Sequence, residues 1–510
     1  MVYKVFSGTV GGIFGDLITV EVDSSTGLPC LDMIGLLGSE VREAKERVRV
    51  SLKNNGINLP PMRITVNLSP ADEHKEGAAF DLPIATALLG VFGYIPFFDN
   101  LNTLIIGELS LDGEVKGVKG ILPIVSMAAK RGFKQVIIPK DNAAEAGLVN
   151  GIDILPVNSI GELLGLLSCT QQNGDFLYER VSIEPNSEEE SVPDFLDVYG
   201  QENAKRAAAI ATAGFHHLLM IGPPGTGKSL IAKRIPGIMP KLTYEESLEI
   251  STIYSVAGKL GKNLPFVTKR PFWSPHSSST SQAIIGGGQK AAPGLVSLSH
   301  HGILFLDEIP EFKREILDML RQPLEDGQVT VSRMKKNYTY PAGFMLVGAM
   351  NPCPCGYYPD RSRCNCTTPQ IMRYTGRLSG PILDRIDICV EVSRISPEEL
   401  ENRSLKSENS KDIREKVVKA VETQRKRYIT EAFNYNSQIP AWKIKEYVPL
   451  GDKETAFMNS LYDSKKFSLR SFYKAIRVAR TIADYDGEDN VTIKHLAEAT
   501  CFRLPDYFGG

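Results

Sequence analysis

A glycine-rich loop between an apolar run and a helical segment constrains this chain more than any other stretch. Residues 218–221 are apolar and have strand character, and they lead into Gly222-Pro223-Pro224-Gly225-Thr226-Gly227-Lys228-Ser229. A strand, a G-x-x-x-x-G-K-S loop and a helix in this order form a phosphate-binding loop, whose backbone N–H groups and helix N-terminus face the phosphates. Lys228 is expected to contact the β- and γ-phosphates, and the Ser229 hydroxyl to help hold Mg²⁺. The sequence therefore predicts a nucleoside-triphosphate site, with ATP and Mg²⁺ as cofactors, in an α/β domain.

Two carboxylates after a second apolar run complete the expected phosphate site. Residues 303–306 have the pattern of a buried parallel strand, and Asp307 and Glu308 follow it directly. The carboxyl ends of parallel strands are where α/β sheets bind ligands. Asp307 is therefore expected to hold Mg²⁺, and Glu308 to orient and polarise the attacking water.

Length and composition set outer limits on the architecture. At 510 residues the chain is too long for one core, so about three domains are expected. No apolar run is long enough to span a membrane, and the first residues do not resemble a signal peptide, so a cytoplasmic protein without a membrane partner is expected. The formal net charge of −2 provides no global field that attracts nucleic acid, so DNA binding would need a local basic patch.

Four cysteines lie close together in the sequence. Cys353 and Cys355 form one C-x-C pair, and Cys364 and Cys366 form another. In a reducing compartment two thiolate pairs that close a loop favour tetrahedral zinc over disulfides, although C-x-C is tighter than the usual C-x-x-C. We expect a structural Zn²⁺ site without a catalytic role.

Two glycine-rich or basic segments interrupt the ATPase region. Residues 284–294 contain a glycine run that suits a protruding loop, and they include Lys290. Residues 325–341 alternate like a β-hairpin. Near the middle of the hairpin lie Arg333, Lys335 and Lys336. Arg333, Lys335 and Lys336 form either a surface that follows the phosphate backbone of a nucleic acid or simply the solvated face of a hairpin.

The chain divides into four regions by pattern. Residues 1–167 are predicted to form an α+β domain of short alternating elements, 168–193 a polar linker, 194–390 the ATPase domain and 391–510 a set of helices. Expected strands of the first domain cover 3–10, 17–22, 63–68, 104–109 and 135–138, and expected helices cover 40–54, 80–89 and 124–130. A helix is expected over 202–213, and the C-terminal helices over 410–428, 441–448, 452–461, 469–485 and 493–499.

The first domain resembles the proteolytic domain of Lon-type peptidases. The similarity rests on residues 107–115 and on Val136-Ile137-Ile138-Pro139-Lys140. A peptidase of this type needs a Ser nucleophile and a Lys base. The matching segment Lys75–Pro83 contains no serine, and the helix that begins Ile121-Leu122-Pro123 lacks the lysine. We therefore expect a Lon-like fold without peptidase chemistry, since a fold alone does not carry function.

As a whole, the chain resembles the YifB/ComM family of magnesium-chelatase-like AAA+ proteins. The resemblance rests on the phosphate loop, the His300-His301-Gly302 lead into the acidic strand, the four cysteines and Leu383-Asp384-Arg385-Ile386-Asp387. It implies a multidomain α/β architecture with an N-terminal Lon-like domain, a central AAA+ domain with two pore hairpins, and a C-terminal helical lid.

The resemblance also assigns roles to individual residues. Asn351, at the end of an apolar strand, takes the role of sensor 1, although it could simply cap a turn. Arg385 takes the role of an arginine finger that reaches the γ-phosphate of a neighbouring subunit. The simpler role is an ion pair with Asp384 or Asp387, and one residue can fill both roles. Arg470 is the expected sensor-2 residue of the lid. Arg477 and Arg480 are expected to be ion-pairing surface residues, although either could take the sensor-2 role instead.

The last predictions concern the adenine and the biological activity. Val198 and Tyr199 either contact the adenine or pack in the core. An arginine that acts in trans implies a ring, taken here as a homo-hexamer. The resemblance implies an ATP-driven DNA translocase or helicase that promotes branch migration during DNA uptake and recombination. The alternatives are a magnesium-chelatase-type ATPase that remodels a protein partner and, third, a Lon-like peptidase.

Overall fold

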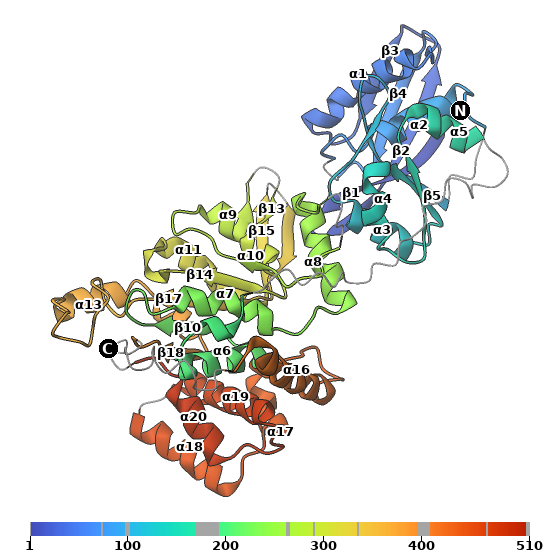
Figure 1. The fold of residues 1–510 in the computed structure, drawn as a ribbon. Coiled ribbons are helices and arrows are strands. Elements are labelled where there is room, and N and C mark those ends of the chain that lie inside the picture. The colour runs from blue at the N-terminus through green and yellow to red at the C-terminus, as the bar shows by residue number, and fades with distance from the viewer. Residues whose placement is uncertain are drawn as a thin grey trace. The chain divides into compact units, whose positions relative to one another are not determined.

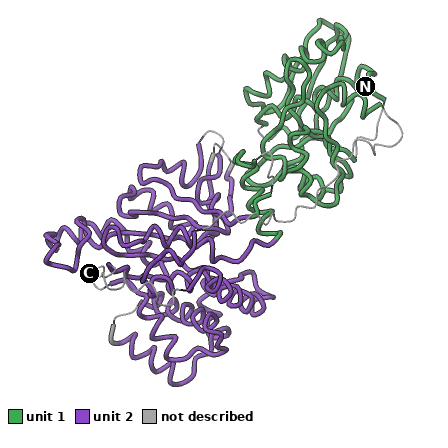
Figure 2. The backbone as a smooth tube through the Cα atoms, viewed as in Figure 1, with its two compact units in different colours: residues 1–186, 244–268 green, residues 187–243, 269–510 purple. Residues whose placement is uncertain are grey.

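The computed structural model describes residues 2–72, 75–96, 102–168, 193–261, 266–288, 291–333, 336–394, 408–465 and 468–505 (Figure 1). These residues form two compact units, each of which combines two stretches of the chain (Figure 2). The first unit comprises residues 1–186 and 244–268, and the second comprises 187–243 and 269–510. Most of the expected linker, residues 169–192, lies outside the described residues.

The first unit is built on a seven-stranded mixed sheet with the order β3-β4-β2-β1-β5-β8-β9. Pairing is antiparallel for β1 with β2 and for β2 with β4, and parallel elsewhere in this sheet. The strands are β1 (Tyr3–Gly11), β2 (Phe14–Ser25), β3 (Cys30–Ile34), β4 (Arg63–Ser69), β5 (Thr103–Ile105), β8 (Gln135–Pro139) and β9 (Asp153–Val157). A separate short hairpin consists of β6 (Glu108–Leu109) and β7 (Val115–Lys116).

Helices cover both faces of this sheet because successive strand residues point to opposite sides. Val136 and Ile138 belong to one apolar cluster, and Ile137 between them belongs to the other. One cluster includes residues of α1 (Ser39–Asn54), α2 (Asp81–Val91) and α5 (Ile160–Ser168), and the other includes residues of α3 (Ile121–Lys130) and α4 (Ala143–Ala146). The unit is thus a three-layer sandwich.

A helix from the ATPase part of the sequence completes this first unit. Helix α8 (Tyr244–Ala257) packs against α3, and Leu248 lies against the same apolar cluster. The Tyr244 hydroxyl donates a 2.7 Å hydrogen bond to the carbonyl of Leu148, and the Gly120 N–H donates to the carbonyl of Ser255 at 3.2 Å. Residues 244–268 therefore pack with the first unit although they fall inside the range 194–390.

The second unit is built on a five-stranded parallel sheet with the order β11-β14-β17-β10-β18. Its strands are β10 (Leu218–Ile221), β11 (Phe272–Trp273), β14 (Ile303–Leu306), β17 (Met345–Met350) and β18 (Ile388–Glu391). Every residue of β10, β14 and β17 is buried, as expected for central parallel strands. Helices of this part are α6 (Glu202–Gly214), α7 (Lys228–Ile238), α9 (Ser281–Ile285), α10 (Leu295–Leu298), α11 (Arg314–Met319), α12 (Arg321–Asp326), α13 (Thr368–Thr375) and α14 (Gly380–Leu383).

The last part of the chain is helical and packs on the same core as the sheet. It comprises α16 (Ser410–Arg427), α17 (Ile444–Tyr447), α18 (Asp452–Lys465), α19 (Leu469–Asp486) and α20 (Ile493–Cys501), and α16 and α19 contact α6. No helix within the described ranges has both the length and the apolar character needed to cross a membrane.

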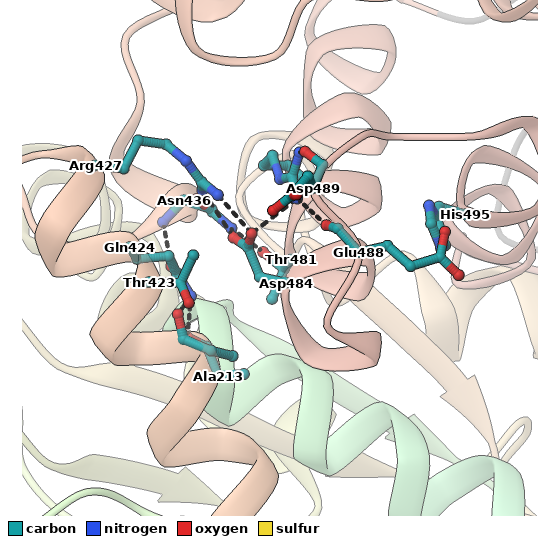
Figure 3. A network of polar contacts seen from close by, with 12 residues as sticks. Ala213, Thr423, Gln424, Arg427, Asn436, Thr481, Asp484, Glu488, Asp489 and His495 are labelled. Atoms are coloured by element: carbon teal, nitrogen blue, oxygen red, sulfur yellow. Dashed lines mark hydrogen bonds and ion pairs between the residues drawn. The ribbon is translucent and has the colours of Figure 1, made fainter.

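A buried polar network fixes how these helices pack (Figure 3). The side chain of Asp484 is 1% exposed and accepts hydrogen bonds from Arg427 at 2.6 Å and from Arg480 at 2.8 Å. Gln424 of α16 donates to the carbonyl of Ala213 at the end of α6, at 2.9 Å. Arg480 is ion-paired as expected, but it is buried rather than on the surface. A buried charge without partners is costly, so the network specifies one arrangement of α6, α16 and α19.

Candidate nucleotide site

The loop from Gly222 to Gly227 connects β10 to the N-terminus of α7. Gly225 and Gly227 have φ of +76° and +92°, conformations that favour glycine. The Lys228 ammonium donates hydrogen bonds to the carbonyls of Gly222 at 2.7 Å and Pro223 at 2.8 Å, so it lies against the inside of the loop. Burial lowers the pKa of Lys228, and the charges of Asp307 and Glu308 oppose this shift. The loop therefore presents a desolvated cation and the first turn of α7, which fits a polyphosphate.

The two expected magnesium ligands lie in contact. The Ser229 hydroxyl donates a 2.6 Å hydrogen bond to the Asp307 carboxylate. Ser229 is in the first turn of α7, and Asp307 follows β14, so residues far apart in sequence meet at one edge of the sheet. A hydroxyl and a carboxylate are hard oxygen donors of the kind that Mg²⁺ prefers, so this pair fits the ion.

Glu308 occupies a strained backbone position. Its φ is 48°, and its N–H donates to the Asp307 carboxylate at 3.0 Å. Left-handed backbone at a residue other than glycine costs free energy and is common at functional sites. Glu308 is exposed and lines a hollow of ≈ 360 Å³. The other residues that line it are Glu311, Asn351, Pro354, Gln370, Arg373, Tyr374 and Arg377.

Asn351 lies beside the phosphate loop. Its side-chain oxygen accepts a hydrogen bond from the Lys228 ammonium at 3.3 Å. It directly follows β17, the strand between β14 and β10. Lys228, Ser229, Asp307, Glu308 and Asn351 therefore gather at the carboxyl ends of three adjacent strands.

Arg385 and Arg470 share one acidic partner that the sequence did not indicate. Both guanidinium groups donate to the carboxylate of Glu325, Arg470 at 3.2 Å. Asp387 pairs instead with His216 at 3.2 Å, and Asp384 lies 3.9 Å from Arg470. Burial alone would raise the pKa of Asp387, but the hydrogen bond from His216 and the nearby Lys474 hold it below its usual range. The simpler expected role, an ion pair of Arg385 with Asp384 or Asp387, is therefore wrong, since Arg385 pairs with Glu325.

The two residues considered for adenine binding have different environments. Val198 is 5% exposed and belongs to the apolar core, whereas Tyr199 is 46% exposed. Core packing therefore accounts for Val198, and an adenine contact by either residue stays a prediction.

The four clustered cysteines form a compact thiol group. Their sulfur atoms all lie within 4.8 Å of one another, with Cys353 to Cys355 at 3.3 Å and Cys353 to Cys364 at 3.7 Å. Four thiolates around one zinc ion at ~2.3 Å stand about 3.8 Å apart, so Cys353, Cys355, Cys364 and Cys366 fit this ion. Burial opposes ionisation of Cys355, but the N–H of Tyr357 and the neighbouring thiols lower its pKa to about 7.

The thiol group lies next to the phosphate loop. Gly356, directly after Cys355, has φ +87°, and a Cβ at this position would be 2.6 Å from Cδ of Pro224. The cysteine loop thus packs closely on the phosphate loop, which only glycine permits here.

The two segments expected to form hairpins each contain a pair of antiparallel strands, and their position at a pore stays a prediction. One consists of β12 (Gly286–Gly287) and β13 (Ala292–Pro293), and the other of β15 (Gln328–Arg333) and β16 (Lys336–Pro341). They contact each other, because the Tyr340 hydroxyl donates to the carbonyl of Ala291 at 2.7 Å. Lys290 and Lys335 lie outside the described residues, as do the side chains of Arg333 and Lys336.

Three family models match the chain and together cover most of it. "Magnesium chelatase, subunit ChlI" matches residues 194–400, "Subunit ChlI of Mg-chelatase" matches 20–142, and "Magnesium chelatase, subunit ChlI C-terminal" matches 407–503.

Individual relatives are similar over nearly the full length. Competence protein ComM of Haemophilus influenzae is 39% identical over 502 residues, which cover 98% of this chain and 97% of the relative. The protein YifB of Escherichia coli is 40% identical over 499 residues, 97% of this chain and 96% of the relative. A magnesium-chelatase 38 kDa subunit of Rhodobacter capsulatus is 27% identical over 225 residues, 41% of this chain and 58% of the relative.

Proposed function

Because the chain belongs to the YifB/ComM family of magnesium-chelatase-like AAA+ ATPases, we propose that it is a ring-forming motor that hydrolyses ATP to move along DNA. The observation that carries the ATPase part is the meeting of Ser229 with Asp307, beside Lys228 and Asn351. The residues that bind phosphate, hold the metal and contact the attacking water then lie at one edge of the sheet.

The chemistry follows from the positions of these side chains. Backbone N–H groups of residues 222–227 and the Lys228 ammonium bind the phosphates, with Lys228 exchanging its loop carbonyls for phosphate oxygens. Bound Mg²⁺, held through Ser229 and Asp307, would neutralise charge on the β- and γ-phosphates. Glu308 polarises the attacking water in the hollow that it lines, and Asn351 orients it. Arg385 and Arg470 stabilise the transferred phosphoryl group across an interface between two subunits, so the working form is a homo-hexameric ring.

The DNA part of the proposal has separate support. The full-length similarity to a competence protein favours a role in DNA uptake and recombination, in which the motor promotes branch migration. The hairpins β12–β13 and β15–β16 are two-stranded ribbons. In the sequence, Lys290 lies between β12 and β13, and Arg333, Lys335 and Lys336 lie where β15 ends and β16 begins. Cations on a pore-lining ribbon would follow the phosphate backbone.

The first unit is proposed to keep a Lon-like fold without peptidase activity, as a domain for an unidentified protein partner. The segment Lys75–Pro83 has no serine nucleophile.

Forked DNA is expected to raise the ATPase rate of the purified protein, because DNA in the pore would be the substrate that the hairpins move. The measurement is the steady-state rate with and without forked DNA, with Lys228→Ala as the inactive control. The Arg333→Ala/Lys335→Ala/Lys336→Ala triple variant should keep its basal rate and lose the stimulation. Equal rates with and without DNA, together with stimulation by a co-purifying protein, would instead support a chelatase-type remodeller, which the match to magnesium-chelatase models favours as the second candidate.

A structural Zn²⁺ in the cysteine cluster is the accompanying proposal. The purified protein is expected to contain about one zinc per chain, and Cys355→Ser to lose most of it, because a closed site needs all four thiolates. Cys501→Ser is the matched control, since both thiols are exposed and Cys501 is not part of the cluster. Metal content is measured by atomic emission, and a zinc-free wild-type protein would contradict the assignment.

A further inference from the structure

Glu325 holds two arginines that the proposed function assigns to the phosphate of a neighbouring subunit. One carboxylate oxygen accepts from Arg385 and the other accepts from Arg470 at 3.2 Å. Each of the three residues comes from a different part of the second unit: α12, the segment after α14, and α19. One exposed carboxylate thus neutralises two cations at once.

The arrangement keeps Arg385 folded against its own subunit. Its side chain is only 14% exposed, and its Nη1 donates to the carbonyl of Pro381 at 2.6 Å. Its buried Nε has no hydrogen-bond partner in the part of the chain that the structure describes. An arginine that reaches a neighbouring subunit must be extended and exposed, so Arg385 has to leave Glu325 before it can act in trans.

Glu325 also stands at the base of a hairpin. It is the second-last residue of α12, and Gly327, with φ +64°, separates that helix from β15. The carbonyl of Gly327 accepts from the N–H of Ala342, directly after β16, at 2.7 Å. Gly327 is therefore linked to both strands, to β15 through the chain and to β16 through this hydrogen bond. A displacement of the Glu325 end of α12 is transmitted to both strands through Gly327.

We propose that Glu325 is a positioning residue that couples the phosphate site of a neighbouring copy of this chain to the β15–β16 hairpin. Without a phosphate opposite them, Arg385 and Arg470 remain on Glu325. The γ-phosphate of a nucleoside triphosphate bound to the neighbour competes for the same guanidinium donors and withdraws both from the carboxylate. The end of α12 is then released, and the hairpin that follows it changes position.

This inference rests on the proposed function, and it makes a prediction that a purely structural ion pair does not. A structural pair on the surface has a small effect on stability and none on coupling. A carboxylate that competes with phosphate lowers the basal rate, so its removal should raise that rate.

The test is Glu325→Gln, measured for ATPase rate with and without forked DNA. The basal rate is expected to rise about two- to tenfold, as the loss of two partly exposed ion pairs allows. The ratio of the rate with DNA to the rate without DNA is expected to fall towards one, because Glu325 no longer links the hairpin to Arg385 and Arg470. In Glu325→Gln/Arg385→Ala the rise should disappear. Asp326→Asn, the adjacent exposed acid, is the matched control and should behave like wild type.

Two outcomes would overturn the inference. One is a Glu325→Gln protein with the basal rate and DNA stimulation of Asp326→Asn. The other is a basal rate that falls together with the melting temperature. If Glu325→Gln does not fold, Glu325→Asp keeps the charge but shortens the reach, and a wild-type response to DNA in that variant would also count against the coupling. Failure of the proposed function can be told apart from failure of the coupling, because it would appear in the wild-type protein. The wild-type ATPase rate would then not exceed that of Lys228→Ala, or it would not respond to DNA.

Discussion

Glu308→Gln is expected to lower kcat for ATP hydrolysis by about 10²–10⁴-fold, the usual contribution of a general base, while ATP binding stays close to wild type. Glutamine preserves the shape of the side chain but cannot take up a proton or polarise water as a carboxylate does. Binding depends on the phosphate loop and the Lys228 ammonium, which this substitution leaves in place. The measurements are kcat from steady-state hydrolysis and the Kd of ATP.

Glu311→Gln is the matched control for Glu308. Both carboxylates line the same hollow, but Glu311 pairs with Arg377 at 2.7 Å. Breaking this exposed pair should change the rate by less than about fivefold. An equal loss of kcat in both variants would contradict the role of Glu308 as general base, because it would show that only the total negative charge of the hollow matters.

Arg385→Ala is expected to lower kcat by about 10³-fold or more, the range reported for arginine fingers. The guanidinium would stabilise charge on the γ-phosphate of the neighbouring subunit, so the loss should appear in the rate and not in ATP binding. Arg314→Ala is the control, since this side chain is 74% exposed and 3.8 Å from Asp318, its ion-pair partner.

Mixing two inactive proteins distinguishes action in trans from action within one subunit. Arg385→Ala keeps an intact phosphate loop, and Lys228→Ala keeps an intact Arg385. An interface that joins the loop of the first to the arginine of the second is complete, so the mixture should hydrolyse ATP faster than either protein alone. A mixture with only the summed rates of its components would place Arg385 in its own subunit's site.

Most of the nucleotide site could be predicted from sequence because its residues follow strands. Four or more buried residues precede the phosphate loop, Asp307 and Asn351, which places the loop and both side chains at the carboxyl ends of parallel strands. Such ends meet at one edge of the sheet. The helices of residues 410–501 and the strands β1, β2, β4 and β8 also agree with their expected ranges within a few residues.

Features that depend on distant contacts could not be predicted. Strands β3 and β9 and helix α5 carry short or mixed patterns that did not stand out. The expected strand over 104–109 is divided between β5 and β6.

Glu325 has no local signal in the sequence, since an exposed acid before an Asp-Gly turn is typical of any helix end. Its role comes from Arg385 and Arg470, which are 60 and 145 residues away in the sequence. The division of the chain into regions likewise gave no sign that residues 244–268 pack with the first unit.

Helix α8 packs with the first unit although it follows α7 of the second unit in the chain, and this affects the order in which the protein folds during synthesis. Domains generally fold as units as they leave the ribosome, beginning at the N-terminus. Here the side of α3 that contacts α8 is covered only after residue 257 has been made, by which time the phosphate loop and α7 have already been synthesised. The first unit therefore cannot finish before the second has begun, and a chain cut after α5 would leave that side of α3 open to water.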